Sequence, residues 1–81
     1  MTKDEIFQRL SDYLVEFFEV PREHITLSAN LYQDLDLDSI DAVDLVVKLQ
    51  DLIQKKIPPT EFKSVRTVGD VVETVYTLLK N

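Results

Sequence analysis

The sequence predicts an all-α protein: a four-helix bundle of three main helices and one short third helix, with a long loop between the first and second helices. Apolar residues recur at helical spacing in three segments, and the three prolines lie between those segments. Only Leu35–Asp38 alternates as a strand would, and no other segment is suited to pair with it. A chain of 81 residues is long enough for one domain, so we expect residues 1–81 to fold as a single unit.

The first helix is predicted from Lys3 to about Glu19. Thr2 and Glu5 have the spacing of a capping box, in which each side chain binds the backbone N–H of the other residue. Pro21 then prevents the helix from continuing. The apolar residues at helical spacing are Ile6, Phe7, Leu10, Tyr13, Leu14, Phe17 and Phe18.

A long loop is predicted to follow, ending near Leu37. Loops of this length are uncommon in compact domains and are usually functional. His24 is the only histidine and has no second candidate ligand near it in the sequence, so we interpret it as a loop residue rather than a catalytic base. Single apolar residues are expected to pin the loop to the core, namely Ile25, Leu27, Leu31, Leu35 and Leu37.

The second helix is predicted to begin at Asp38 or Ser39, with Asp38 as the N-cap, and to end near Ile53. A helical wheel places its charged residues within an arc of roughly 80°. Those residues are Asp41, Asp44, Lys48 and Asp51. Most of the remaining circumference is apolar, and a domain this small cannot cover all of it. Ile40, Val43 and Val47 are therefore candidates for an exposed apolar surface, and core packing is the equal alternative.

Two further helical segments complete the predicted bundle. Pro58–Phe62 interrupts the chain and is expected to form one short helical turn. Thr67 and Asp70 resemble another N-cap, and apolar residues at helical spacing continue to about Lys80. Those residues are Val68, Val71, Val72, Val75, Tyr76 and Leu79. Valine has a modest helix propensity, so this helix should depend on tertiary packing.

The charge of the chain is concentrated in one stretch. The net charge is −6, which disfavours nucleic acid and anionic membranes as partners. Residues 34–51 contain six acids and one base, so this stretch carries −5 of the total. The acids are Asp34, Asp36, Asp38, Asp41, Asp44 and Asp51. A general need for solubility would not produce such a concentration, and recognition of a basic partner would.

Composition excludes several classes of site and suggests a compartment. The absence of cysteine removes disulfides, thiolate metal sites and cysteine nucleophiles, and it fits a reducing compartment. The first residues do not resemble a signal peptide, and no apolar run approaches membrane-spanning length. We therefore expect a cytoplasmic, monomeric protein without stable membrane insertion.

The acidic stretch resembles a calcium-binding loop only in part. Asp34, Asp36 and Asp38 alternate as the first ligands of such a loop do, but Ser39 and Leu45 occupy the positions that require glycine and glutamate. A serine hydrolase would need glycines around its serine, and the only glycine is Gly69. We predict no metal site and no catalytic residue, and therefore a protein that is not an enzyme.

The run from Asp34 to Val46 resembles the phosphopantetheine attachment motif of acyl carrier proteins, in which Asp-Ser-Leu precedes a helix that carries acidic residues. The resemblance extends to the order of elements over nearly the whole chain. It implies that Ser39 carries 4'-phosphopantetheine donated by coenzyme A, and that the arm holds acyl intermediates as thioesters in fatty-acid or polyketide-type biosynthesis. A helix N-terminus suits this site, because its free N–H groups and dipole favour a phosphate.

The resemblance also implies a surface for partner enzymes. Acidic residues at the start of the second helix would face basic patches on a phosphopantetheinyl transferase and on acyl-chain synthases and transferases, with apolar contacts beside them. The predicted partner-binding residues are Asp38, Ile40, Asp41, Val43, Asp44, Val47 and Asp51. In the family the acyl chain is held between the helices, and the aliphatic residues of the second and last helices are candidates to line that space.

Several positions depart from the pattern of the family. Asp36 stands where the family often has glycine, and Ile40 replaces the more common leucine. Lys48 and Gln50 interrupt the acidic stripe, and Lys48 has the spacing to pair with Asp44. A carrier dedicated to a specialised pathway is therefore as good an interpretation as a general fatty-acid carrier. The alternatives are a peptidyl or D-alanyl carrier protein and an unmodified acidic helical protein-interaction module.

Overall fold

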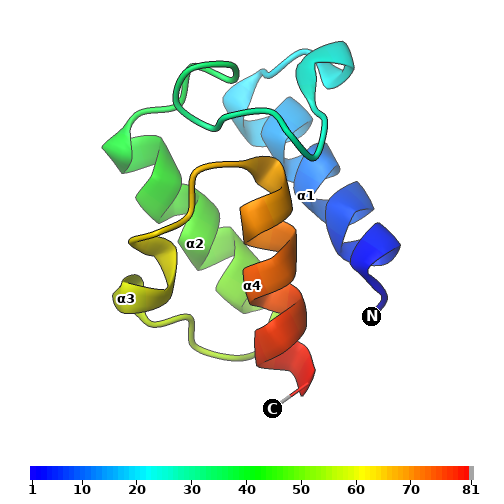
Figure 1. The fold of residues 1–81 in the computed structure, drawn as a ribbon, viewed down its shortest axis with the longest axis vertical. Coiled ribbons are helices and arrows are strands. Elements are labelled where there is room, and N and C mark those ends of the chain that lie inside the picture. Colours follow the sequence, from blue (N-terminus) through cyan, green and yellow to red (C-terminus); the bar gives the residue numbers. More distant parts are fainter. Residues whose placement is uncertain (81) are drawn as a thin grey trace.

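The computed structural model describes residues 1–80 and shows four α-helices, with no strand among these residues. The predicted all-α bundle with a short third helix is therefore confirmed. A long connection between the first two helices crosses one end of the bundle (Figure 1). The elements are α1 (Lys3–Phe18), a 3-10 turn (Arg22–His24), α2 (Ser39–Ile53), α3 (Pro59–Phe62) and α4 (Val68–Lys80).

The predicted starts of α1 and α4 are confirmed by hydrogen bonds. Glu5 N donates to Thr2 Oγ1 (3.2 Å) and Thr2 N donates to Glu5 Oε1 (3.0 Å), which is the expected capping box. At α4, Asp70 N donates to Thr67 Oγ1 (3.1 Å), and the Asp70 carboxylate accepts from Thr67 N (3.1 Å) and Arg66 N (3.0 Å). These bonds satisfy backbone donors that a helix start otherwise leaves unpaired.

Two helices end in a left-handed residue that is not glycine. Glu19 (φ 56°) follows the last residue of α1, and Gln54 (φ 57°) follows the last residue of α2. Glycine is the usual residue at such a position because it has no Cβ to clash. Both ends therefore retain some backbone strain.

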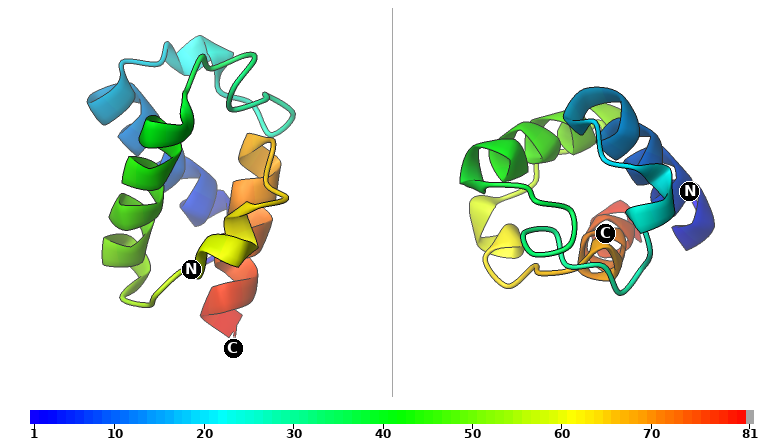
Figure 2. Two further views of the ribbon diagram at one scale, coloured as in Figure 1. Left: turned by 90° about the vertical axis from the view of Figure 1, so that its left-hand side faces the viewer. Right: turned by 90° about the horizontal axis from the view of Figure 1, so that it is seen from above.

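The helices α1, α2 and α4 are arranged around a common core (Figure 2). The most extensive packing is between α1 and α4. The largest side chains that are fully buried are Ile6, Leu10, Leu14, Leu45, Leu49, Val68, Val71 and Val75. The valine-rich α4 buries four valines in this core, as its dependence on tertiary packing requires. No helix among residues 1–80 combines the length and the apolar character needed to cross a bilayer.

The long loop is anchored by its side chains and by its backbone. Ile25, Leu31, Leu35 and Leu37 are buried as predicted. Leu27 was expected to join them, and that prediction is wrong: its side chain is 56% exposed, and the contact is made by its carbonyl oxygen, which accepts from Gly69 N (2.8 Å).

Backbone hydrogen bonds also join the loop to the start of α4. An isolated antiparallel bridge pairs Asn30 with Thr67. Leu31 N donates to Arg66 O (2.9 Å), and Val68 N donates to Ala29 O (3.0 Å). These bonds were not predicted from the sequence. They hold the loop against the start of α4, and the same loop leads into the start of α2.

Candidate functional site

The first turn of α2 is closed by a second capping box. Asp41 N donates to Asp38 Oδ1 (2.9 Å), and Asp38 N donates to Asp41 Oδ2 (3.2 Å). Asp38 is therefore the N-cap, as predicted, and Ser39 is the first residue of the helix. Asp38 and Asp41 were both predicted to contact partners, and the structure shows that they also hold the helix start in place.

Ser39 is exposed at this helix start. Among residues 1–80 its hydroxyl has no hydrogen-bond partner, and the N–H groups of Ser39 and Ile40 are not bonded to any acceptor. Two free N–H groups at the positive end of a 15-residue helix favour a phosphate ester at this position. The site therefore combines an accessible nucleophilic oxygen with donors for the phosphate that would be joined to it.

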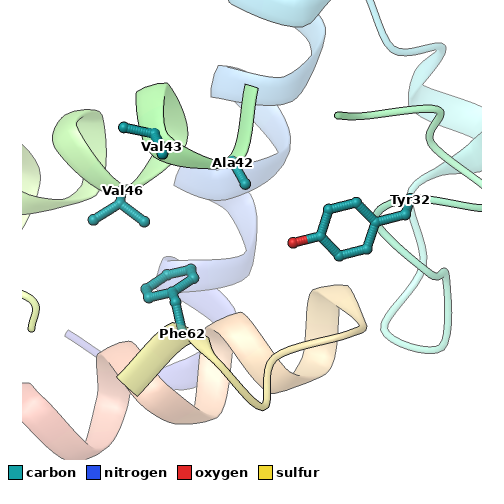
Figure 3. A pocket seen from close by; sticks show the side chains of 5 residues that line it. All are labelled: Tyr32, Ala42, Val43, Val46 and Phe62. Atoms are coloured by element: carbon teal, nitrogen blue, oxygen red, sulfur yellow. The ribbon is translucent and has the colours of Figure 1, made fainter. Parts of the chain in front are cut away.

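The face of α2 that carries Ser39 leads into an apolar pocket. Ser39, Ala42, Val43 and Val46 have the spacing i, i+3, i+4 and i+7, so they share one face of the helix. The rise of an α-helix places Val46 about 10 Å along the axis from Ser39. The pocket opens between α2, α3 and the long loop (Figure 3), and its volume is about 200 Å³. It is lined by Tyr32, Ala42, Val43, Val46 and Phe62.

The residues that line this pocket differ from those expected. The sequence suggested aliphatic residues of the second and last helices, but no residue of α4 lines the pocket. Val68, Val71 and Val75 of α4 are instead fully buried in the core. Tyr32 and Phe62 were missed, because each is an isolated aromatic residue outside the regular helical patterns.

An apolar strip runs along the outer face of α2. Ile40, Val43 and Val47 are 72%, 63% and 53% exposed, so the structure places all three at the surface rather than in the core. Asp44 and Asp51, also exposed, border this strip. Large exposed aliphatic side chains next to acids are typical of a surface that docks a partner.

Lys48 does not interrupt the acidic face in the way that was expected. Its spacing would allow a pair with Asp44, but the structure does not form one: the ion pairs that join two residues within 1–80 are Lys3–Glu73 and Arg22–Asp12. Its Nζ instead lies 4.4 Å from the ring centroid of Phe17 on α1, a cation–π contact. Lys48 is thereby held toward α1, and Asp44 remains open to solvent.

The other side of the α2 start has a more polar pocket of about 330 Å³. Its lining includes Glu19, His24, Asp36 and Asp41. No group of three or more potential metal ligands is placed around a common point within residues 1–80. Asp36 has φ 60°, a left-handed conformation, which is a physical reason for glycine to be common at this position.

Comparison with known proteins identifies the family. Residues 8–75 match the family described as "Phosphopantetheine attachment site". The chain is 51% identical to "Acyl carrier protein 2" of Ralstonia nicotianae, over 98% of each chain. This chain belongs to the acyl carrier protein family. It is also 41% identical to "Acyl carrier protein" of Lactobacillus johnsonii, over 93% of this chain and 94% of that one, and 37% identical to "Acyl carrier protein" of Saccharopolyspora erythraea, over 98% and 83%.

Membership of the acyl carrier protein family implies a 4'-phosphopantetheine prosthetic group. The start of α2 fits such a group, because it offers an exposed serine hydroxyl and two free N–H groups. An apolar pocket lies along the same face of the helix.

Proposed function

We propose that this protein carries acyl intermediates as thioesters on a 4'-phosphopantetheine arm attached to Ser39, in fatty-acid or polyketide-type biosynthesis in the cytoplasm. One observation carries the proposal. Ser39 is the exposed first residue of α2, and it shares a helix face with the residues that line the apolar pocket. A modified Ser39 therefore has free N–H groups for the phosphate and a pocket for the cargo.

The attachment reaction requires no catalytic group on this chain. Ser39 Oγ attacks the phosphorus next to the pantetheine unit of coenzyme A, a phosphodiester forms, and the pyrophosphate bond breaks to release adenosine 3',5'-bisphosphate. The transferase accepts the proton of the serine hydroxyl. The carrier contributes an accessible oxygen at a helix N-terminus that stabilises the new negative charge.

We infer that partner enzymes dock on the exposed face of α2. Ile40, Val43 and Val47 supply the apolar centre of this surface, and Asp44 and Asp51 supply charges at its rim. Rim charges mainly raise the association rate and set orientation, whereas a small apolar centre keeps the complex short-lived. A carrier that visits several enzymes in turn needs both properties. Asp38 and Asp41 add charge at the edge nearest Ser39.

Modification is tested by intact-mass analysis after the apo protein is incubated with coenzyme A and a broad-specificity phosphopantetheinyl transferase. We expect the wild type and Ser64→Ala to gain one phosphopantetheine group, and Ser39→Ala to gain none. Ser64 is the matched control because it is another exposed serine. A wild type that gains no group, or a Ser39→Ala variant that is still modified, would overturn the proposal and favour an unmodified interaction module.

The type of cargo is tested on the holo protein. We expect acyl donors to load the arm through acyltransferases that act on acyl carriers. Loading by amino-acid-activating enzymes alone would instead identify a peptidyl or D-alanyl carrier. The product in each case is a thioester, which hydroxylamine cleaves and mass analysis detects.

A further inference from the structure

The pocket beside α2 is closed on its far side by two aromatic rings. Phe62 of α3 faces Val46 across the pocket, and Tyr32 of the loop reaches toward Ala42 with its hydroxyl directed into the space between them (Figure 3). Among the described residues of the lining, only Tyr32 has a polar side-chain group, its hydroxyl. Such a pocket suits an uncharged, apolar guest.

Phe62 is held in place by the residues on either side of α3. Ile57 and Val65 flank this short helix, and both are buried in the core. Val65 N also donates to Phe62 O (3.2 Å), and α3 packs against α4. The ring of Phe62 is therefore a fixed wall rather than a side chain on a free loop.

Tyr32 is held by the turn that contains it. Asn30 Oδ1 accepts from Tyr32 N (2.9 Å) and from Gln33 N (2.9 Å), and Asn30 N donates to Asp34 Oδ2 (2.7 Å). The neighbouring Leu31 is buried in the core. Both aromatic walls of the pocket are thus attached to ordered backbone.

The pocket does not continue into the core. None of the fully buried side chains of the bundle lines it. Leu45 and Leu49 lie next to Ala42 and Val46 on the surface of α2, but both side chains are fully buried in the core and neither lines the pocket. A guest that enters beside Val43 therefore meets Phe62 and has no open path between α2 and α4.

The volume of the pocket sets the size of its guest. An apolar cavity of about 150 Å³ takes up benzene, a molecule of six carbons. In proportion, a volume of about 200 Å³ accommodates about six to eight carbons. We propose, on the basis of the carrier function proposed above, that this protein shelters short acyl groups of up to about eight carbons and that Phe62 sets this limit.

The proposal is tested with carriers that differ only in the acyl group. The transferase attaches the whole acyl-pantetheine unit when it is given acetyl-, butanoyl-, hexanoyl-, octanoyl-, dodecanoyl- or hexadecanoyl-coenzyme A, and intact mass confirms each product. We expect Tm to rise by about 2 °C for each methylene that the half-open pocket covers, up to octanoyl. From octanoyl to hexadecanoyl the Tm should stay level, because the added carbons remain in water.

Two variants test the role of Phe62. In Phe62→Ala, the chain length at which Tm stops rising should increase from octanoyl to about dodecanoyl. Phe62→Leu keeps more of the apolar contact, so this chain length should increase by less. The leucine variant also serves if the alanine variant does not fold. Phe17→Ala is the matched control, because Phe17 is a half-exposed aromatic residue outside the pocket. In this variant Tm should stop rising at the same chain length as in the wild type.

Three results would overturn the size limit: a Tm that rises through hexadecanoyl in the wild type, a Tm that does not depend on chain length, or an unchanged plateau in both Phe62 variants. Each of these results is obtained on protein whose loading has been verified by mass. Failure of the carrier function would appear earlier and separately, as the absence of any loaded product.

Discussion

The two sides of the bundle are built from the same residue types but packed differently. Where α1 meets α4, Leu10 and Val71 are completely buried. Where α2 meets α3, Val46 and Phe62 are only partly buried and Val43 is largely exposed, around an apolar pocket. The difference indicates that stability is concentrated on the α1–α4 side, which leaves the α2–α3 side free to take up and release a guest.

The lengths of the helices explain why α2 stays partly uncovered. α3 has four residues, which span about 6 Å, whereas the 15 residues of α2 span about 22 Å. One helical turn cannot cover a helix of four turns. The short α3 therefore leaves Val43 and Val46 only partly covered around the pocket.

The largest expected effect comes from a cavity on the α1–α4 side of the bundle, called here the closed side; the α2–α3 side around the pocket is the open side. Leu10→Ala removes a fully buried side chain and should lower the free energy of unfolding by about 3 kcal/mol. Val46→Ala removes a side chain that already faces a pocket, so it should lower the free energy of unfolding by only about 1 kcal/mol. Urea unfolding of the two apo variants measures both values. Equal losses would contradict the division of the bundle into a closed and an open side.

A smaller effect is expected where the loop meets α4. A Cβ on Gly69 would lie 2.9 Å from the carbonyl oxygen of Leu27, which is closer than a methyl group can approach without a shift of backbone. The same oxygen accepts the hydrogen bond from Gly69 N (2.8 Å). Gly69→Ala should therefore lower the free energy of unfolding by about 1–2 kcal/mol, although alanine normally favours a helix. A neutral or stabilised variant, measured by the same urea titration, would show that the loop moves away without cost.

The ends of α1 and α2 offer a matched pair with a smaller effect. Glu19→Gly should relieve the left-handed strain after α1 and raise the free energy of unfolding by about 0.5 kcal/mol, after the greater chain entropy of glycine is subtracted. Gln54→Gly should raise the free energy of unfolding by less, because Gln54 Nε2 donates to Asp51 O (2.7 Å) and this hydrogen bond would be lost. Thermal unfolding of both variants gives the comparison, and a larger gain at Gln54 would argue against this account.

The closed side was more accessible to sequence analysis than the open side. Helical spacing predicted the buried faces of α1 and α4, and capping residues predicted the starts of α1, α2 and α4, because these signals lie within a few consecutive residues. Ser39 could be chosen as a candidate for the same reason, since its motif and its helix start are local features.

The pocket could not be predicted, because it depends on contacts between distant segments. Tyr32 and Phe62 are thirty residues apart in the sequence, and only the anchoring of the loop and of α3 brings both to one face of α2. The contact that Lys48 makes could not be predicted for a similar reason. Spacing along α2 pointed to Asp44, but the competing ring of Phe17 belongs to another helix.

The smallest expected effect is on the acid stability of the closed side. Backbone N–H groups of Arg66 and Thr67 donate to the Asp70 carboxylate and hold the pKa of Asp70 below its ordinary value. The folded protein therefore binds this proton less tightly than the unfolded chain does, and the stabilisation is complete above about pH 4, the pKa range of a free aspartate. It is lost as the pH falls through the lower pKa of the folded state.

Asp70→Asn should make the free energy of unfolding fall less steeply with decreasing pH below about pH 4, since the variant no longer has this titration. Glu5→Gln should act in the same direction at the start of α1, because the backbone N–H of Thr2 lowers the pKa of Glu5. Both groups are exposed, so solvent and salt screen each contribution. Urea titrations at a series of acidic pH values measure the slopes, and a slope in Asp70→Asn equal to that of the wild type would show that the start of α4 does not contribute to acid unfolding.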